Sequence, residues 1–112
     1  LPMVLADAVM IEQIIVNLVR NGMDAMRATP VARRQVRIRT HLEGHTVQVR
    51  ISDRGAGIPP ETAARLFEPF FTRHAKGTGL GLYIARELAE ANDATLELAA
   101  STCGADFVLT GR

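Results

Sequence analysis

A glycine-rich segment of this chain has the composition of a polyphosphate-binding turn. Gly77, Gly79 and Gly81 alternate there, and apolar residues at helical spacing follow. Glycines let a backbone approach a ligand and adopt positive φ, and the free amides at a helix N-terminus attract anions. Positive charge would come from the basic residues just before the glycines: Arg73, His74 and Lys76. A plain loop before a helix has the same composition, so this segment alone leaves both interpretations open.

A second set of candidate residues lies on one face of a helix predicted over residues 7–26, with Asp7 as its N-cap. Apolar residues recur there at steps of three and four, which predicts one face packed on a core. The polar stripe between them consists of Gln13, Asn17, Asn21 and Asp24. This stripe is either a solvated face or a row of oxygen donors for a ligand or Mg²⁺, which prefers oxygen ligands.

The third candidate is a carboxylate at the end of a predicted strand. Asp53 is followed closely by Gly55, Gly57 and Ile58. The segment is either a simple turn or a nucleobase site. In a nucleobase site Asp53 would accept a hydrogen bond from the base, and the glycines would let the base come close.

The other elements follow from hydrophobic periodicity. Alternation over 36–42 and 47–52, around a turn at 43–45, predicts an antiparallel hairpin with one buried and one wet face. Residues 1–6 resemble a strand end, a short helical segment starts near Pro60, and a helix runs from the glycine turn to about Asn92. Strands are predicted at 95–98 and 107–109. Phe67, Phe70 and Phe71 are either core residues or the anchor of a loop.

Composition limits the function classes. The 112 residues are enough for one domain with a single core. With 13 basic and 12 acidic residues, no Trp and one Tyr, the chain favours neither nucleic acid nor a membrane surface as a partner. No apolar run approaches the ~20 residues of a membrane span. Cys103 is the single cysteine, which fits a reducing cytoplasm.

Together these segments resemble the ATP-binding catalytic domain of sensor histidine kinases, in the superfamily that includes DNA gyrase, Hsp90 and MutL. Within the family the chain is most similar to the nitrogen-regulation and PilS-like kinases. Four motifs, in the family's order, carry the resemblance over essentially the whole chain. They are an N box at 17–25, a first glycine box at 53–58, an F box at 66–72 and a second glycine box at 77–82.

The resemblance implies a fold and a domain extent. We expect an α/β two-layer sandwich of the Bergerat type, in which a mixed, mostly antiparallel sheet has its helices packed on one face. ATP would lie between the helices and a lid. The domain would cover residues 1–112. Because the chain begins later than the family's domain usually does, its N-terminal strand is expected to be truncated.

The resemblance also implies roles for the candidate residues. Asn21 would supply the Mg²⁺ ligand, Asn17 would approach the phosphates or the metal, and Asp53 would hydrogen-bond the adenine amine. The expected nucleotide-binding set adds the base pocket, the lid and the phosphate cradle. Its further members are Asp24, Gly55, Gly57, Ile58, Thr72, Arg73, His74, Lys76, Gly77, Thr78, Gly79, Leu80, Gly81 and Leu82.

Three departures from the family pattern bear on these expectations. Gly22 stands where Ala is usual, which lowers helix propensity by up to ~1 kcal/mol. Arg73 and His74 stand where relatives often carry Thr and Lys, so the cationic phosphate contact would come from Arg73 or Lys76. Asn92-Asp93-Ala94 replaces a common His-Gly-Gly.

The implied chemistry is phosphoryl transfer from ATP with Mg²⁺, which is mostly positioning and charge neutralisation. None of the three histidines lies in a helical His-Glu-type motif, so the acceptor is expected on an upstream dimerisation domain. A response regulator, possibly NtrC-like, would be the second partner. The chain would be a cytoplasmic domain of a membrane-associated bacterial sensor without direct membrane contact.

Three alternatives stay open. A water-using ATPase of the gyrase or MutL kind would need a Glu as general base where this chain has Asn17, and an amide cannot take a proton from water. A non-catalytic ATP-binding regulatory module and a serine-phosphorylating relative are the other two.

Overall fold

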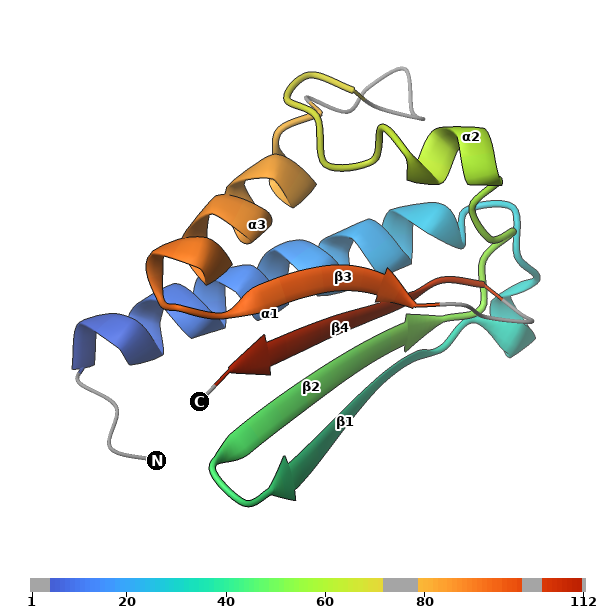
Figure 1. The fold of residues 1–112 in the computed structure, drawn as a ribbon. Helices are drawn as coiled ribbons and strands as arrows, with labels where there is room; N and C mark the ends of the chain where they lie inside the picture. Colours follow the sequence, from blue (N-terminus) through green and yellow to red (C-terminus); the bar gives the residue numbers. More distant parts are fainter. Residues whose placement is uncertain (1–4, 72–78, 100–103, 112) are drawn as a thin grey trace.

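The structure is a computed structural model that describes residues 5–71, 79–99 and 104–111. It has two layers, with α1 and α3 lying on one face of a four-stranded sheet (Figure 1). The elements follow in the order α1 (Leu5–Ala25), η1 (Val31–Arg33), β1 (Val36–Glu43), β2 (Thr46–Asp53), α2 (Pro60–Ala63), α3 (Gly81–Ala91), β3 (Thr95–Ala99) and β4 (Asp106–Gly111). The expected sandwich is therefore confirmed.

The sheet has the order β1-β2-β4-β3, and all three described strand pairs are antiparallel. The last strand of the chain is thus central. It brings Asp106 opposite Ser52, beside the strand end that carries Asp53. This topology places the start of β4 at one of the predicted sites.

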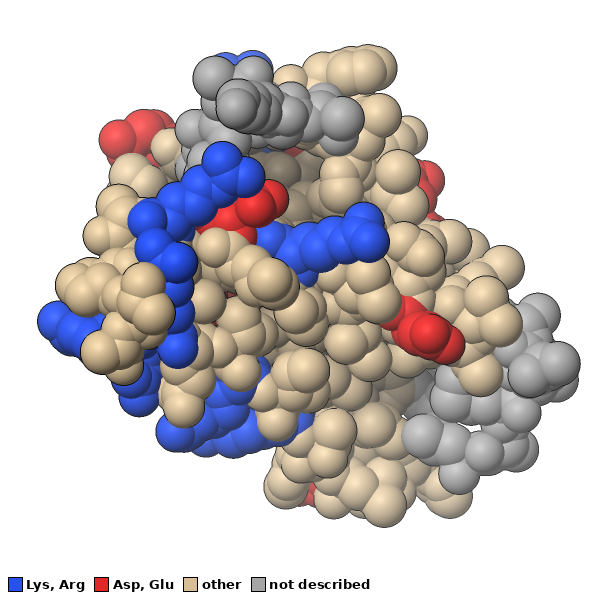
Figure 2. Space-filling view, turned by 180° about the vertical axis from the view of Figure 1, so that it is seen from behind, with Lys and Arg blue, Asp and Glu red and all other residues tan. Residues whose placement is uncertain are grey.

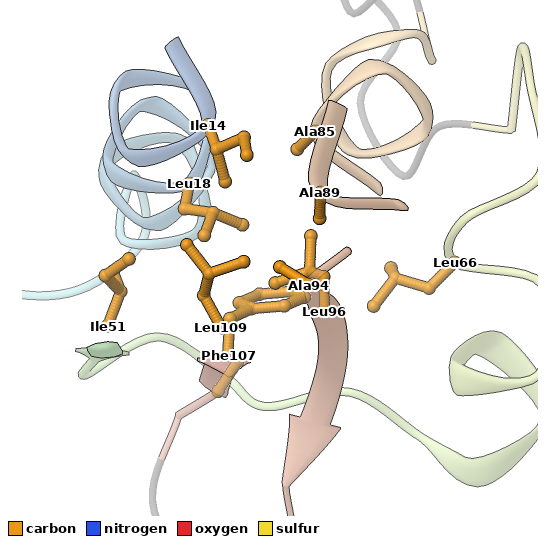
Figure 3. Close-up of a cluster of buried hydrophobic side chains, with 11 residues drawn as sticks. Ile14, Leu18, Ile51, Leu66, Ala85, Ala89, Ala94, Leu96, Phe107 and Leu109 are labelled. Atoms are coloured by element: carbon orange, nitrogen blue, oxygen red, sulfur yellow. The ribbon is translucent and has the colours of Figure 1, made fainter. Parts of the chain in front are cut away.

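The core lies between the two helices and the sheet. Ile14 and Leu18 of α1 point toward Ala85 and Ala89 of α3, above Phe107 and its neighbours on the strands (Figure 3). All four helical side chains are fully buried. Because Ala85 and Ala89 are small, the backbone of α3 can come close to α1 and hold the start of α3 in place.

The predicted start of the first helix was wrong. The helix begins at Leu5, so Leu5 and Ala6 are helical rather than the end of a strand, and Asp7 lies within the helix rather than at its N-cap. Leu and Ala are strong helix formers, and here they extend the helix past the capping signal. Residues 1–4 lie outside the described residues.

The hairpin forms as predicted, but its buried face is incomplete. Ile38 and Leu42 of β1 are 50% and 67% exposed, although they alternate with polar residues. The reason is the strand order, because β1 is an edge strand and α1 packs mainly on β2. Sequence alternation predicts the face to which a residue points, but not whether a helix covers it.

The departure at residues 92–94 has a structural consequence. Asp93 has a φ of 57°, the left-handed conformation that glycine adopts without penalty and that Asp tolerates better than most residues. The side-chain amide of Asn92 donates to the carbonyl of Leu88 at 2.8 Å and to Sδ of Met10 at 3.1 Å. These bonds end α3 and tie it to α1.

Among the described residues, none of the helices is long and apolar enough to cross a membrane.

Candidate functional site

Asp53 is held by backbone hydrogen bonds at the end of β2. Its side chain is buried, and Oδ1 accepts from the N–H of Gly55 at 2.8 Å and of Ala105 at 3.3 Å. Its own N–H donates to the carbonyl of Ala105 at 3.0 Å. Within the described residues both recorded bonds to the carboxylate end on Oδ1. The carboxylate is therefore fixed in orientation, and Oδ2 is left to accept another donor.

Three glycines surround this carboxylate. A Cβ on Gly55 would lie 2.7 Å from the carbonyl oxygen of Ala25, and a Cβ on Gly104 would lie 2.7 Å from the carbonyl carbon of Asp53 and overlap its oxygen. Gly104 also has a φ of +70°. A side chain at either position would displace the backbone that holds Asp53. The sequence alone does not indicate this role of Gly104, since its nearness to Asp53 depends on the central position of β4.

Gly22, the first departure from the family pattern, is the third of these glycines. It is buried, and a Cβ there would lie 3.3 Å from both Asp53 Cβ and Val36 Cγ2. Those contacts are tighter than ordinary van der Waals packing. Gly22 thus lets α1 lie close against the strand ends that carry Asp53 and Val36.

Met26 is a further supporting residue that sequence reasoning missed. Its side chain is buried, and Sδ accepts from the N–H groups of Gln35 at 3.3 Å and Arg54 at 3.4 Å. The hydroxyl of Thr29 donates to the carbonyl of Arg54 at 3.3 Å. The end of α1 therefore holds the residue that follows Asp53. Helical spacing predicts that Met26 faces the core, but the thioether contacts depend on tertiary structure.

The first glycine box continues away from Asp53 with two further predicted residues. Gly57 has a φ of +83°, and a Cβ there would lie 3.5 Å from the carbonyl oxygen of Gly104. Ile58 is half-buried and packs against the core. These residues fix the course of the loop that follows Asp53.

The polar stripe of α1 is more exposed to solvent than Asp53. Asn17 Oδ1 accepts from Gln13 Nε2 at 3.2 Å, and Asp24 pairs with Arg27 at 3.2 Å with both side chains about half exposed. The Asn21 side chain differs, since its Nδ2 is buried and has no hydrogen-bond partner among the described residues. A buried amide without a partner is unusual in a folded chain and indicates a group that would complete it.

The stripe fits a magnesium–phosphate group only in part. Amide oxygens of Asn17 and Asn21, one helical turn apart, are suitable Mg²⁺ ligands. The described residues contain no group of three or more His, Cys, Asp or Glu that could hold a metal by themselves. Phosphate oxygens and water would therefore have to supply the remaining ligands, as they commonly do for Mg²⁺.

The described part of the second glycine box lies against the F box. The N–H of Phe70 donates to the carbonyl of Gly79 at 2.8 Å, and a Cβ on Gly79 would lie 2.6 Å from Phe70 Cα. α3 then begins at Gly81, where a Cβ would meet nothing within 4 Å, while Leu80 and Leu82 are half-buried. The turn is thus tied at one end and leaves open space at the helix start. Six predicted residues lie outside the described residues: Thr72, Arg73, His74, Lys76, Gly77 and Thr78.

The three phenylalanines of the F box have different surroundings. Phe67 packs edge-on against Phe107, with ring centroids 6.1 Å apart, and the Arg86 guanidinium lies 5.0 Å from its ring. Phe71 lies under Arg65 at 4.7 Å, and Phe70 is 75% exposed with a φ of 67°. Phe67 is therefore the core residue of the three, whereas Phe70 anchors the glycine turn through its backbone.

The structure brings the N box and the first glycine box together around Asp53. The two described histidines are not near it, because His41 and His45 flank the opposite end of the hairpin from the Val36–Asp53 pair. His41 lies 3.7 Å from Glu43 and both are largely exposed. His74 lies outside the described residues. The described part of the site thus contains no histidine.

Comparison with known proteins identifies the family to which this fold belongs. The family model described as histidine kinase-, DNA gyrase B- and HSP90-like ATPase matches residues 6–110. The C4-dicarboxylate transport sensor protein DctS of Rhodobacter capsulatus is 40% identical over 96 residues, which cover 86% of this chain and 15% of DctS. The sensor protein kinase PilS of Pseudomonas aeruginosa is 40% identical over 93 residues, which cover 81% of this chain and 17% of PilS.

Among solved structures, the catalytic domain of the histidine kinase ThkA superposes with a TM-score of 0.78 at 29% identity. The match covers 91% of this chain and 65% of that domain. The chain therefore spans nearly two thirds of a catalytic domain, but less than a fifth of the two curated relatives.

Proposed function

This chain belongs to the family of histidine kinase-, DNA gyrase B- and HSP90-like ATPases and is a histidine kinase-type ATPase domain. On this premise we propose that it binds ATP with Mg²⁺ through the residues around Asp53 and Asn21, and donates the γ-phosphoryl group to a histidine outside this chain. The alternatives, an ATPase or a regulatory module, are less well supported by the comparisons, since DctS is named as a sensor protein, PilS as a sensor protein kinase and ThkA as a histidine kinase.

The orientation of Asp53 is the observation that carries the proposal. Two backbone N–H groups hold Oδ1, which leaves Oδ2 as the acceptor for a donor from the nucleotide. The exocyclic amine of adenine is such a donor, whereas guanine presents a carbonyl oxygen at the corresponding position. Asp53 would therefore select adenine.

Asn17 and Asn21 would serve the other end of the nucleotide. Asn21 would contribute its amide oxygen to Mg²⁺, and Asn17 would approach the phosphates or the metal one turn away. Bound Mg²⁺ would supply charge neutralisation to the phosphates. The residues of this chain then position the γ-phosphoryl group, which is the main requirement of phosphoryl transfer.

Asn17 also distinguishes transfer from hydrolysis. An amide cannot take a proton from water, so this position provides no general base for hydrolysis. The acceptor must come within about 3–3.5 Å of the γ-phosphate, and the described histidines are at the far end of the hairpin. We infer that the acceptor histidine lies on an upstream dimerisation domain, and that a response regulator of the NtrC-like kind receives the phosphoryl group next. The chain would be the cytoplasmic part of a membrane-associated sensor.

Transfer is tested with γ-labelled ATP. The chain alone should bind ATP without labelling itself and should release phosphate slowly. Addition of the cognate dimerisation helices, linked or in trans, should produce label on their histidine, which acid removes because phosphohistidine is acid-labile. A matched control replaces the acceptor histidine of those helices with Gln and should abolish the label.

Three results would contradict the proposal. Acid-stable label on this chain would indicate a serine kinase. Rapid phosphate release without an acceptor would indicate an ATPase. Binding without transfer, even with the helices present, would indicate a regulatory module.

A further inference from the structure

The outer face of the sheet, which is turned away from α1 and α3, carries a local group of arginines. Ile51 is buried toward the helices, so Ser52 and Arg50 on β2 point to the other side, as do their register partners Arg37 and Arg39 on β1. Figure 2, which looks from the side of α1, shows that basic side chains also gather at the end of the molecule that holds η1. The whole chain has a net charge of only +1, so this is a local excess.

Most of this charge has no carboxylate partner. Asp106, on the central strand β4, pairs with Arg50 at 3.0 Å, and its side chain is only 15% exposed. That ion pair is neutral as a unit. No ion pair is recorded within the described residues for Arg37, Arg39 or Arg54, although Arg54 Nη1 donates to the carbonyl of Arg33 at 3.5 Å. The charges of these three guanidinium groups therefore remain to attract an anion.

These residues line a cavity of about 250 Å³ at the end of the hairpin. Its walls are formed by Gln35, Arg37, Arg39, Ser52 and Arg54, together with two acidic residues, Asp53 and Asp106. The Ser52 hydroxyl is buried and has no hydrogen-bond partner in the described part of the chain. A buried donor is usually satisfied, so its free state beside three cations points to an anionic acceptor.

We propose that this cavity binds a single oxyanion group, a phosphate or a carboxylate. The Ser52 hydroxyl donates to one oxygen, and Arg37 and Arg39 neutralise the charge from the strand that pairs with it. Asp106 opposes the anion, but Arg50 already compensates its charge. Asp53 lines this cavity as well as the proposed nucleotide site, so the two sites are neighbours. Ser52 points away from Asp53, because consecutive residues of a strand point to opposite faces, and the anion would therefore lie on the outer face of the sheet.

The test is a titration of the isotope-labelled chain, followed by amide and arginine Nε chemical shifts. Inorganic phosphate and acetate are the two probes, each added at constant ionic strength made up with chloride. We expect saturable shifts at Ser52, Arg37 and Arg39. The probe that binds more tightly tells whether a phosphate group or a carboxylate is the natural ligand. Any phosphate binding near Asn17 and Asn21 is recognised by the different set of shifted residues.

Two variants and a control complete the test. Ser52→Ala and Arg37→Gln should each weaken binding by about tenfold, because each removes a charge-assisted hydrogen bond. Arg33→Gln removes the same charge from an exposed position that does not line the cavity and should change affinity less than twofold, or about 0.4 kcal/mol. Shifts that grow linearly without saturation, or that are unchanged in Arg37→Gln, would show an adventitious ion only and overturn the proposal.

Discussion

The two ends of the proposed nucleotide site differ in how many of their polar groups already have hydrogen-bond partners within the protein. At the base end, Asp53 is buried and held through three backbone hydrogen bonds, with glycines from three segments packed around it. At the phosphate end, the described partner of Asn17 is one exposed glutamine, and the buried Nδ2 of Asn21 has no hydrogen-bond partner within the described residues.

This contrast shows where preorganisation lies. The base end is fixed before any ligand binds. It should therefore contribute mainly to the difference in affinity between one base and another. The phosphate end has polar groups that remain incomplete in the protein alone. Its contribution should therefore depend on the metal and the phosphates, and changes there should affect the ligand-bound state more than folding.

The largest expected effect is at Gly104, on the base end. Gly104→Ala should lower the free energy of unfolding by about 2–4 kcal/mol, since positive φ costs roughly 1–2 kcal/mol and displacement of Asp53 costs about as much again. The control is Gly44→Ala in the hairpin turn, where φ is +61° but a Cβ meets nothing within 4 Å. Urea unfolding measures both. Equal losses would mean that Gly104 supports only a turn.

Removal of the Asp53 charge comes next. Asp53→Asn should weaken ATP binding by roughly tenfold to a hundredfold, the effect of about 1–3 kcal/mol for a mismatched buried partner. The domain should stay folded, because the amide oxygen can still accept from Gly55 and Ala105. Asp106→Asn makes the same change on the outer face and should leave ATP affinity unaltered. Calorimetry on the two variants separates these cases.

At the phosphate end, Asn21→Ala should weaken nucleotide binding in Mg²⁺ by roughly threefold to tenfold, about 0.5–1.5 kcal/mol, and metal-free binding by less. Unfolding stability should not fall, since the buried Nδ2 that is removed has no hydrogen-bond partner among the described residues. Gln13→Ala, on the same stripe but exposed, serves as the control. If both affinities of Asn21→Ala fell equally, Asn21 would be structural instead.

The smallest effect is expected at Gly22, where two terms oppose each other. Alanine in a helix is favoured over glycine by up to ~1 kcal/mol, but its Cβ would lie 3.3 Å from Asp53 and Val36. Gly22→Ala should therefore change the free energy of unfolding by less than about 0.5 kcal/mol, the usual range for a mild substitution. It should weaken ATP binding slightly. A full gain in thermal stability with unchanged affinity would show that Ala fits here freely.

The sequence was sufficient for the elements and the motif order, because both depend on local patterns. Periods of 3.6 and 2 located α1 and the hairpin, and the helix predicted after the glycines begins at Gly81. Whether a helix covers β1 could not be predicted, since this depends on which strand lies at the edge of the sheet. The predicted start of α1 was wrong for a different reason, because the helix propensity of Leu5 and Ala6 outweighed the capping signal at Asp7.

The candidate site was predictable where one segment supplies both the residue and its support. Asp53 with Gly55 is such a case, because the two are joined by a local hydrogen bond. Gly104, Ala105 and Met26 were missed because they approach Asp53 and Arg54 from distant parts of the chain. The unpaired hydroxyl of Ser52 likewise could not be predicted, because the sequence of that strand shows only the alternation of apolar and polar residues. Long-range contacts of this kind leave no period in the sequence.

Comparison of ATP with GTP tests the central claim most directly, that the oriented carboxylate of Asp53 selects adenine. Isothermal calorimetry on the unmodified chain, with Mg²⁺ and each nucleotide in turn, requires no assumption about the acceptor. The predicted result is that ATP binds roughly tenfold to a hundredfold more tightly, because guanine would place a carbonyl against an acceptor. Equal affinity for ATP and GTP would contradict this role of Asp53.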